Sequence, residues 1–343
     1  MKAAILKTFK VMFACLMLLS GCGFAKQQSY NGVDFIMDTF VEHRWYGKNA
    51  QQTYMDINQK LRDIEVELSW YYPESDISKL NQAAGKHPVA LSDECYSLLK
   101  EAVSYCELSD GIFDITVAPL TKVWNVTAKE PKVPSDTEIE AAKQLVNYKD
   151  IIFNDADKTV MLAKDGMSID LGGIAKGYAA GAVRSIAEQN GVEGYVSIGG
   201  NIMMNGKKPD GSDFIIGVRD PRGDASEYIA TVHLDGLIMA TTGDYERYFE
   251  QDGVRYHHIL DPFTGRPSNS DLMSLTVFSE NGTLADCFST LIFLKGSEGL
   301  PQYLERDDCM IIAVTKDKDV YISSSLRDRV KPNPEKTDYN FVN

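Results

Sequence analysis

The residues best suited to chemistry lie in one glycine-rich segment, Asp170-Leu171-Gly172-Gly173-Ile174-Ala175-Lys176-Gly177. A carboxylate ends a predicted strand, two glycines let the backbone approach a ligand closely, and a predicted helix begins. The N-terminus of a helix attracts anions, and Lys176 adds a full positive charge in its first turn. The same residues also suit a plain strand-to-helix turn in which Asp170 is a cap and Lys176 is solvated.

A second segment offers ligands for a hard cation. Asp286 and Thr290 are four residues apart on a predicted helix, so their side chains share one face. Magnesium commonly takes one or two protein oxygens and fills its other positions with water and phosphate oxygens. In isolation, an aspartate cap and a threonine bonded back into its own helix is the commoner arrangement.

Two adjacent histidines, His257 and His258, stand close to Asp261 and Pro262. A histidine at the end of a strand, beside a carboxylate, suits general acid–base catalysis near neutral pH. Side chains alternate along a strand, so only one of the pair faces a ligand. A purely structural histidine fits these residues equally well.

Apolar and aromatic residues cluster in two further segments, Leu68–Ser78 with Trp70 and Tyr71, and Gly111–Leu120 with Phe113. Aromatic side chains in a loop can stack on a flat ring, which makes a flavin or an adenine a plausible ligand. Packing in the core is the commoner role for such residues.

The N-terminus has the pattern of a targeting segment. Three lysines precede an apolar run over residues 11–19, which ends in Leu-Ser-Gly-Cys at Cys22. This run is too short to span a membrane, and its end resembles a bacterial lipobox. We expect a lipoprotein signal over 1–22 with lipidation of Cys22, a tether over 23–30 and a folded domain over 31–343. The protein would then be extracytoplasmic and lipid-anchored to a bacterial membrane; the alternative is an ordinary signal peptide with a chance cysteine.

The charge balance restricts the ligands. The 343 residues carry a net charge of −14, and the leader holds three of the lysines, so the remainder is more acidic still. Such a surface repels nucleic acid, and a phosphorylated ligand needs a metal ion or a local cluster of donors. The sequence contains no P-loop, G-x-G-x-x-G, G-x-S-x-G or H-E-x-x-H motif, which disfavours the enzyme classes that use them.

Hydrophobic periodicity predicts the elements that must position these residues. Helices are expected over 51–68, 95–108, 136–146, 175–189 and about 284–294. Strands are expected over 33–44, 151–153, 159–162, 168–171, 194–198, 214–218, 228–233, 237–240, 256–260, 272–278, 309–314 and 319–322. This irregular alternation, with several hairpins, predicts an α/β fold of mixed layers rather than a regular parallel sheet.

Taken together and in order, these segments resemble the ApbE family of FAD:protein FMN transferases, from about Met37 to about Gly296. The resemblance implies one ApbE-like domain over 31–343, a two-part fold with mixed sheets flanked by helices. It also implies binding of FAD with Mg2+ and transfer of FMN to a threonine hydroxyl, with release of AMP. The implied partners are FAD and extracytoplasmic acceptor proteins that carry the target threonine.

The resemblance also implies roles for single residues. His258 would be the base for the acceptor threonine. The FAD site would comprise Met37, Tyr71, Ile112, Phe113, Asp114, Asp170, Lys176 and Ile259, and the magnesium ligands would be the Gly173 carbonyl, Asp286 and Thr290.

The chain departs from the family pattern at Asp38, where the family usually has glycine, and at Gly181, where it usually has aspartate. Neither departure touches the implied metal ligands. Two other functions stay open: an FAD pyrophosphatase that yields FMN and AMP, and a lipid-anchored flavin-binding protein. The presence of Asp286, Thr290 and His258 favours catalysis over storage.

Overall fold

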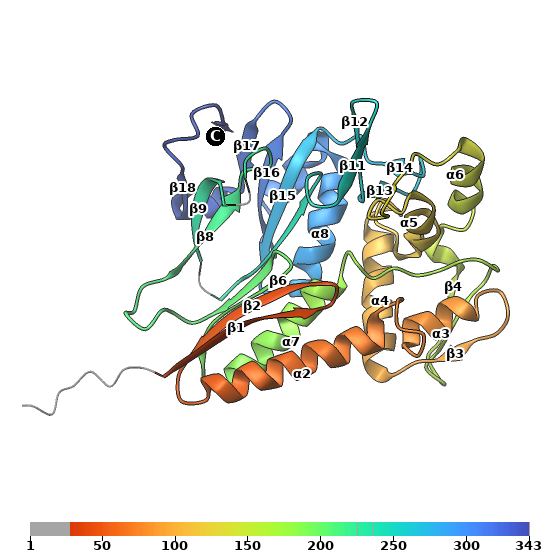
Figure 1. Cartoon of the computed structure of the whole chain (residues 1–343), viewed down its shortest axis with the longest axis horizontal. Helices are drawn as coiled ribbons and strands as arrows, with labels where there is room; N and C mark the ends of the chain where they lie inside the picture. Colours follow the sequence, from red (N-terminus) through yellow and green to blue (C-terminus); the bar gives the residue numbers. More distant parts are fainter. Residues whose placement is uncertain (1–27, 225, 235, 343) are drawn as a thin grey trace, which may run out of the picture.

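Figure 1 shows the computed structural model of the protein, which describes residues 28–224, 226–234 and 236–342. The predicted leader, most of the predicted tether and the lipidation residue Cys22 lie outside these residues. The helices are α2 (Ala50–Leu68), α3 (Asp76–Gln82), α4 (Asp93–Leu108), α5 (Ala118–Trp124), α6 (Asp136–Lys143), α7 (Ala175–Gln189), α8 (Gly282–Lys295) and α9 (Pro301–Leu304). Among the described residues, no helix combines the length and the apolar character that crossing a membrane requires.

In the described part of the chain, nine strands form the main sheet, in the spatial order β1-β2-β6-β7-β10-β15-β16-β17-β19. Their bounds are β1 (Ser29–Ile36), β2 (Thr39–Tyr46), β6 (Glu193–Ile198), β7 (Asn201–Asn205), β10 (Ile238–Gly243), β15 (Leu272–Ser279), β16 (Met310–Thr315), β17 (Asp319–Ile322) and β19 (Asn340–Val342). Neighbouring strands are antiparallel, apart from the parallel pair β17 and β19.

The remaining described strands form smaller sheets. One contains β8 (Phe214–Arg219), β9 (Tyr228–Leu234) and β18 (Val330–Pro332), and another contains β3 (Val89–Ala90), β4 (Ile151–Asn154) and β5 (Thr159–Leu162). Two hairpins complete the set: β11 (Tyr248–Gln251) with β12 (Val254–His257), and β13 (Leu260–Asp261) with β14 (Arg266–Pro267).

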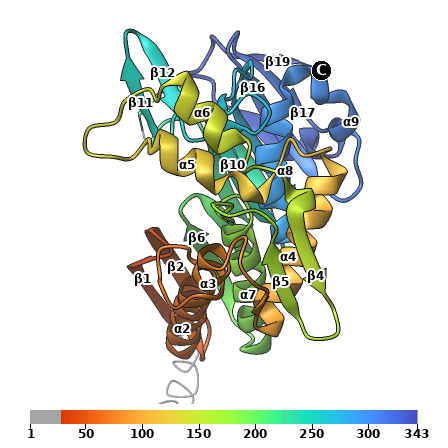
Figure 2. The same ribbon diagram turned by 90° about the vertical axis from the view of Figure 1, so that its right-hand side faces the viewer.

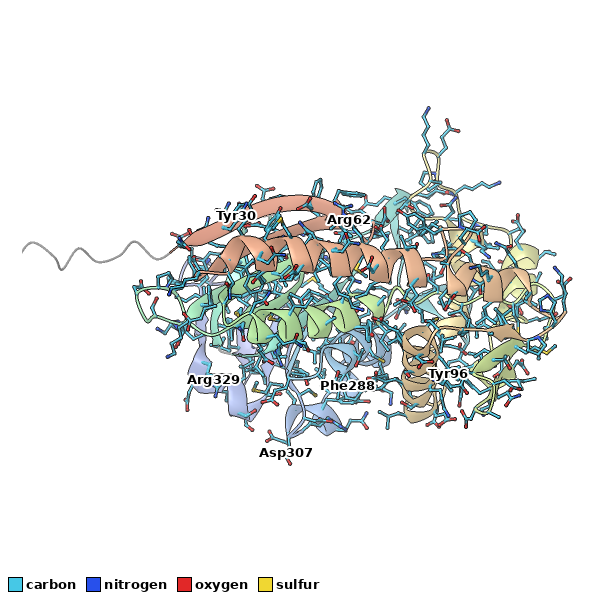
Figure 3. The ribbon with its side chains drawn as sticks, turned by 90° about the horizontal axis from the view of Figure 1, so that it is seen from below. Tyr30, Arg62, Tyr96, Phe288, Asp307 and Arg329 are labelled. Atoms are coloured by element: carbon cyan, nitrogen blue, oxygen red, sulfur yellow. The ribbon has the colours of Figure 1, made fainter. Side chains whose placement is uncertain are left out.

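Helices α2, α7 and α8 pack on one face of the main sheet, and Figure 3 shows α2 and α7 side by side in this layer. The sheet of β8, β9 and β18 contributes to a second core. Along β16, Ile311 and Ala313 join the core beneath the helices, whereas Ile312 and Val314 join the second core. This alternation follows from the two-residue period of a strand and explains why β16 is apolar from Met310 to Val314.

The other part of the molecule contains α3 to α6 and the small sheet of β3, β4 and β5 (Figure 2). Leu120 and Trp124 of α5 pack with Ile139 of α6 in a third core, which also includes Phe249 and Leu260 from the two hairpins. The predicted mixed α/β layers, with mixed sheets flanked by helices, are confirmed.

Three predicted strands are wrong. The one expected over 256–260 is interrupted at His258 and Ile259, which separate β12 from β13. The one expected over 33–44 is a hairpin, β1 and β2, joined by Met37 and Asp38, whose φ angles of 58° and 56° are typical of a type I′ turn. The one expected over 168–171 is an extended loop. The Asn81 side chain bonds both backbone groups of Ile169, and the N–H of Asp170 donates to the carbonyl of Ile115. These hydrogen bonds satisfy the backbone groups of Ile169 and the N–H of Asp170 without a neighbouring strand.

Helix α7 has the bounds predicted from periodicity, Ala175–Gln189, and it crosses α8 at very short range. A Cβ built on Gly177 would lie 2.0 Å from the carbonyl oxygen of Gly282, and one built on Gly282 would lie 2.2 Å from that of Gly177. Both positions therefore require glycine, because any side chain would force the two helices apart.

We predict that Gly177→Ala lowers the free energy of unfolding by about 1–3 kcal/mol or more, because overpacking must displace a backbone. Gly181 lies one turn further along α7, where an added Cβ meets nothing within 4 Å. The control Gly181→Ala should therefore be neutral or stabilising by about 0.5–1 kcal/mol, the usual advantage of alanine in a helix. Urea denaturation measures both, and equal effects would contradict the close crossing.

Candidate active site

The glycine-rich turn leads into the N-terminus of α7 as the sequence predicts. The N–H of Gly172 donates to Asp170 Oδ1 at 2.8 Å, and Lys176 Nζ donates to the carbonyl of Gly172 at 3.0 Å. The carboxylate of Asp170 therefore stabilises the turn, and the side chain of Lys176 folds back over it. Burial raises the pKa of Asp170, while the Gly172 N–H and the Lys176 charge act in the opposite direction.

Asp286 lies on α8 but does not cap that helix. The N-cap is Asn281, whose side chain accepts the N–H of Leu284 at 3.2 Å. The buried carboxylate of Asp286 instead accepts the N–H of Gly177, in the first turn of α7, at 2.8 Å through Oδ2. A negative charge at the N-terminus of α7 complements the dipole of that helix. Asp286 thus joins α8 to the glycine-rich turn.

A backbone oxygen is free at the start of α7. The Gly177 N–H is one of the first-turn donors that have no partner within their own helix, and Asp286 supplies that partner. The Gly173 carbonyl precedes the helix and accepts no hydrogen bond within the described residues. Asp286 Oδ1 also accepts none in that part of the chain. Both oxygens remain available to a cation.

Thr290 completes the predicted ligand set. A Cβ built on Gly173 would lie 3.7 Å from Thr290 Oγ1, so the turn and this side chain are neighbours. A carbonyl, one carboxylate and a hydroxyl are hard oxygen donors of the kind that Mg2+ accepts, and the residues present therefore fit that ion. No group of three or more His, Cys, Asp or Glu side chains in the described residues is placed to hold a metal ion.

Two further hydroxyls, those of Thr242 and Ser289, form hydrogen bonds beside Thr290. Neither residue was among those predicted to form the site. Thr242 Oγ1, at the end of β10, lies 2.7 Å from Ser289 Oγ and 3.2 Å from Thr290 Oγ1. Ser289 Oγ donates to the carbonyl of Asp286 at 2.8 Å. Thr241 and Thr242 are adjacent in the sequence, and only the packing of β10 against α8 identifies Thr242 as the one that faces the site.

The predicted loop with Phe113 and Asp114 lies against the same turn. A Cβ on Gly173 would come within 3.0 Å of the Phe113 ring. Asp114 is buried and accepts three hydrogen bonds, from the N–H and hydroxyl of Thr116 and the N–H of Tyr148. Burial raises the pKa of Asp114, and these hydrogen bonds oppose the shift. Its carboxylate therefore shapes the loop, while the half-buried Ile112 packs against the main core.

His258 follows β12 directly, and its ring reaches solvent, whereas the neighbouring His257 and Ile259 are buried. Both the backbone N–H and Nδ1 of His258 lie close to the carbonyl of Arg247, at 3.0 and 3.2 Å. Desolvation by the surrounding protein lowers the pKa of His258. The contact with the Arg247 carbonyl opposes this shift, and the positive charges of Arg247 and Lys176 add to it. A neutral imidazole at pH 7 can accept a proton.

Two other residues predicted for the FAD site, Tyr71 and Met37, are at least partly exposed. Tyr71 is 67% exposed and its ring contacts that of Trp70, with centroids 4.8 Å apart. Desolvation raises the pKa of Tyr71, and the negative charges of Asp170 and Asp38 add to this. Half-buried Met37 donates its N–H to Glu65 Oε1 at 2.9 Å.

Two cationic residues at the site were missed in the sequence. The charge of Lys122 acts on Asp170, and that of Arg247 acts on Asp170, Tyr71 and His258. Lys122 Nζ donates to Ser168 Oγ at 3.0 Å and lies 5.1 Å from the centre of the Trp70 ring. With Lys176, these residues make a local positive region in an acidic protein. Neither lies in a segment that spacing alone would single out.

Comparisons with known proteins agree with this geometry. Residues 37–314 match the profile of the ApbE family. FAD:protein FMN transferases from Klebsiella pneumoniae and Treponema pallidum are 37% and 30% identical to the chain. The alignments cover 80% and 94% of the chain, and 85% and 94% of those proteins.

Solved structures lead to the same family. The ApbE protein of Thermotoga maritima superposes with a TM-score of 0.82 at 36% identity, and the flavin transferase ApbE of Vibrio cholerae with 0.78 at 27% identity. Each alignment covers 88% of this chain and 99% of the other. The family expected from the order of the five segments is therefore confirmed: the chain belongs to the ApbE family.

Proposed function

We propose that the protein is a magnesium-dependent FAD:protein FMN transferase, which moves the FMN part of FAD to a threonine hydroxyl of an acceptor protein and releases AMP. The names of its curated relatives support the flavin transfer itself. The observation that carries the proposal is the meeting of the Gly173 carbonyl, Asp286 and Thr290 at the N-terminus of α7, beside Lys176.

The first task of the site is to hold the FAD pyrophosphate. Gly173, Asp286 and Thr290 would hold Mg2+, which neutralises the pyrophosphate and stabilises the charge of the departing AMP. The N-terminus of α7 and the Lys176 ammonium add further positive potential. Met37, Tyr71, Ile112, Phe113, Asp114, Asp170, Lys176 and Ile259 are the residues proposed to line the FAD site.

The second task is to activate the acceptor. His258, neutral at pH 7, takes the proton from the threonine hydroxyl, and the oxygen attacks the phosphorus on the FMN side of the pyrophosphate. A new phosphorus–oxygen bond to threonine forms as the bond to the bridging oxygen breaks, and AMP leaves with that oxygen. Positioning and charge stabilisation supply most of the catalysis in such phosphoryl transfers.

The decisive assay incubates the purified protein with FAD, Mg2+ and an acceptor protein that carries a candidate threonine. We expect flavin fluorescence to remain on the acceptor band in a denaturing gel, with AMP formed in equal amount. Free FMN in place of labelled acceptor would identify a pyrophosphatase instead. Unchanged FAD would identify a flavin-binding protein, and both results would contradict flavin transfer.

We predict that Asp286→Asn folds normally but loses magnesium-dependent transfer by on the order of 1,000-fold. The amide oxygen can still accept the Gly177 N–H, whereas the charge that would attract the metal is gone; a metal contributes several kcal/mol to the transition state. A melting curve and a magnesium titration of the transfer rate measure the two effects.

Asp220→Asn is the control. Asp220 is equally buried but binds Lys336 and Tyr339 in the region of β8 and β9. This control should lower the melting temperature and leave the magnesium dependence of transfer unchanged. A normal magnesium response in Asp286→Asn would contradict the metal role.

We also propose that Cys22 carries a lipid and anchors the enzyme on the extracytoplasmic side of a bacterial membrane, where its acceptors would lie. The lipobox pattern supports this. Cys22→Ala should move the protein from the membrane fraction into the soluble fraction, because acyl chains supply most of the membrane affinity of such a protein. If fractionation leaves the variant with the membranes, Cys22 is not the anchor.

A further inference from the structure

The hairpin of β11 and β12 places one residue directly beside His258. Its turn, Asp252-Gly253, has φ angles of 54° and 76°, as type I′ turns require, and this turn fixes the register. Tyr248 pairs with His257, so the next position outward sets Arg247 opposite His258. The N–H of His258 donates to the carbonyl of Arg247 at 3.0 Å, which extends the ladder by one bond.

The same carbonyl determines which ring nitrogen of His258 can act as a base. Nδ1 lies 3.2 Å from the carbonyl oxygen of Arg247. A carbonyl only accepts hydrogen bonds, so this contact requires the proton of the neutral ring to sit on Nδ1. The lone pair is then on Nε2, which makes Nε2 the atom that receives the proton of an acceptor hydroxyl.

The side chain of Arg247 reaches a different hairpin. Its Nη2 lies 3.3 Å from the carbonyl oxygen and 3.2 Å from Oδ2 of Asp38, in the type I′ turn between β1 and β2. Figure 2 shows the two hairpins projecting on the same side of the molecule. The turn also contains Met37, one of the residues proposed to line the FAD site. Arg247 therefore connects the proposed base to the edge of the flavin site.

We propose that Arg247 is a positioning residue for flavin transfer, which orients His258 through its carbonyl and holds the Met37–Asp38 turn against the site through its guanidinium. This inference rests on the proposed function. It also accounts for the departure at Asp38: aspartate tolerates the positive φ of the turn and supplies an oxygen to Arg247 that glycine lacks.

The structural alternative is an ordinary surface ion pair. The side chains of Arg247 and Asp38 are 48% and 65% exposed, and exposed pairs contribute little to stability. Loss of such a pair would leave the rate of transfer and the KM for FAD unchanged. A positioning role instead predicts that the catalytic rate falls while the stability of the fold is preserved.

The first test is Arg247→Ala in the full-length protein, assayed with FAD, Mg2+ and the acceptor. We expect kcat for transfer to fall by about 10- to 100-fold, the usual cost of a small misplacement of a catalytic group. The KM for FAD should rise as well, because the lost guanidinium holds the turn that carries Met37 of the proposed FAD site. The melting temperature should change little. The control Glu246→Ala removes a neighbouring exposed ion pair, that with Arg219 at 3.2 Å, and should keep the kcat of the wild type.

A wild-type kcat in Arg247→Ala would overturn the inference, and so would an equal loss in Glu246→Ala. Failure of the proposed function looks different. In that case the wild-type protein itself transfers no FMN, and the inference is then judged by the tautomer alone.

The second test does not depend on activity. Nitrogen-15 NMR of the imidazole rings at neutral pH reports which nitrogen carries the proton, and the chain has only five histidines. The ring signals that disappear in His258→Gln belong to His258. We expect the Nδ1–H tautomer in the wild type and also in Arg247→Ala, because the substitution leaves the backbone carbonyl of residue 247 in place. An Nε2–H tautomer in the wild type would overturn the assignment.

Discussion

The crossing of α7 and α8 is the constraint on which the rest of the site depends. Backbone meets backbone at Gly177 and Gly282, and this short distance brings the Asp286 carboxylate to the Gly177 N–H. That hydrogen bond satisfies a first-turn N–H of α7 that has no partner within its own helix, and the Gly173 carbonyl next to it accepts no hydrogen bond within the described residues. A wider crossing would separate Asp286 and Thr290 from the glycine-rich turn. The geometry of the proposed metal site is therefore a consequence of how two helices pack.

The distribution of charge at the proposed site differs from what the net charge of the chain suggests. The chain is acidic overall, yet the charges of Lys122, Lys176 and Arg247 interact with that of Asp170, which precedes the N-terminus of α7. A local positive region of this kind binds an anion without making the whole surface attractive to nucleic acid. Burial raises the pKa of Asp170 and lowers that of His258, so the site disfavours charge on both groups until a ligand compensates it.

Two hairpins with the same turn type, β1–β2 and β11–β12, meet beside the proposed site through the contact of Arg247 with Asp38. The turns at Met37-Asp38 and Asp252-Gly253 both have positive φ at both central residues, which matches the twist of the strands that they join. The second turn sets the register that places Arg247 opposite His258, and the first turn receives the Arg247 side chain. Local turn chemistry thus determines where groups distant in sequence meet.

The sequence by itself determined the local elements with strong periodicity, such as α7, and the residue types of the site. Asp170, Lys176, Asp286 and Thr290 could be singled out because spacing along one helix or one turn is a local property. The order of the motifs sufficed for the family. The β1–β2 hairpin was missed because its turn contains no glycine. The loop over 168–171 was predicted as a strand because polar and apolar residues alternate along it.

Only the tertiary structure decided what Asp286 does. An aspartate that caps its own helix and one that accepts an N–H from another helix have the same sequence pattern. They differ only in which N–H group donates to the carboxylate. The same holds for Thr242, Lys122 and Arg247, whose roles depend on strands and helices far away in the chain. Contacts of this kind arise from packing between elements, and periodicity within one element carries no information about them.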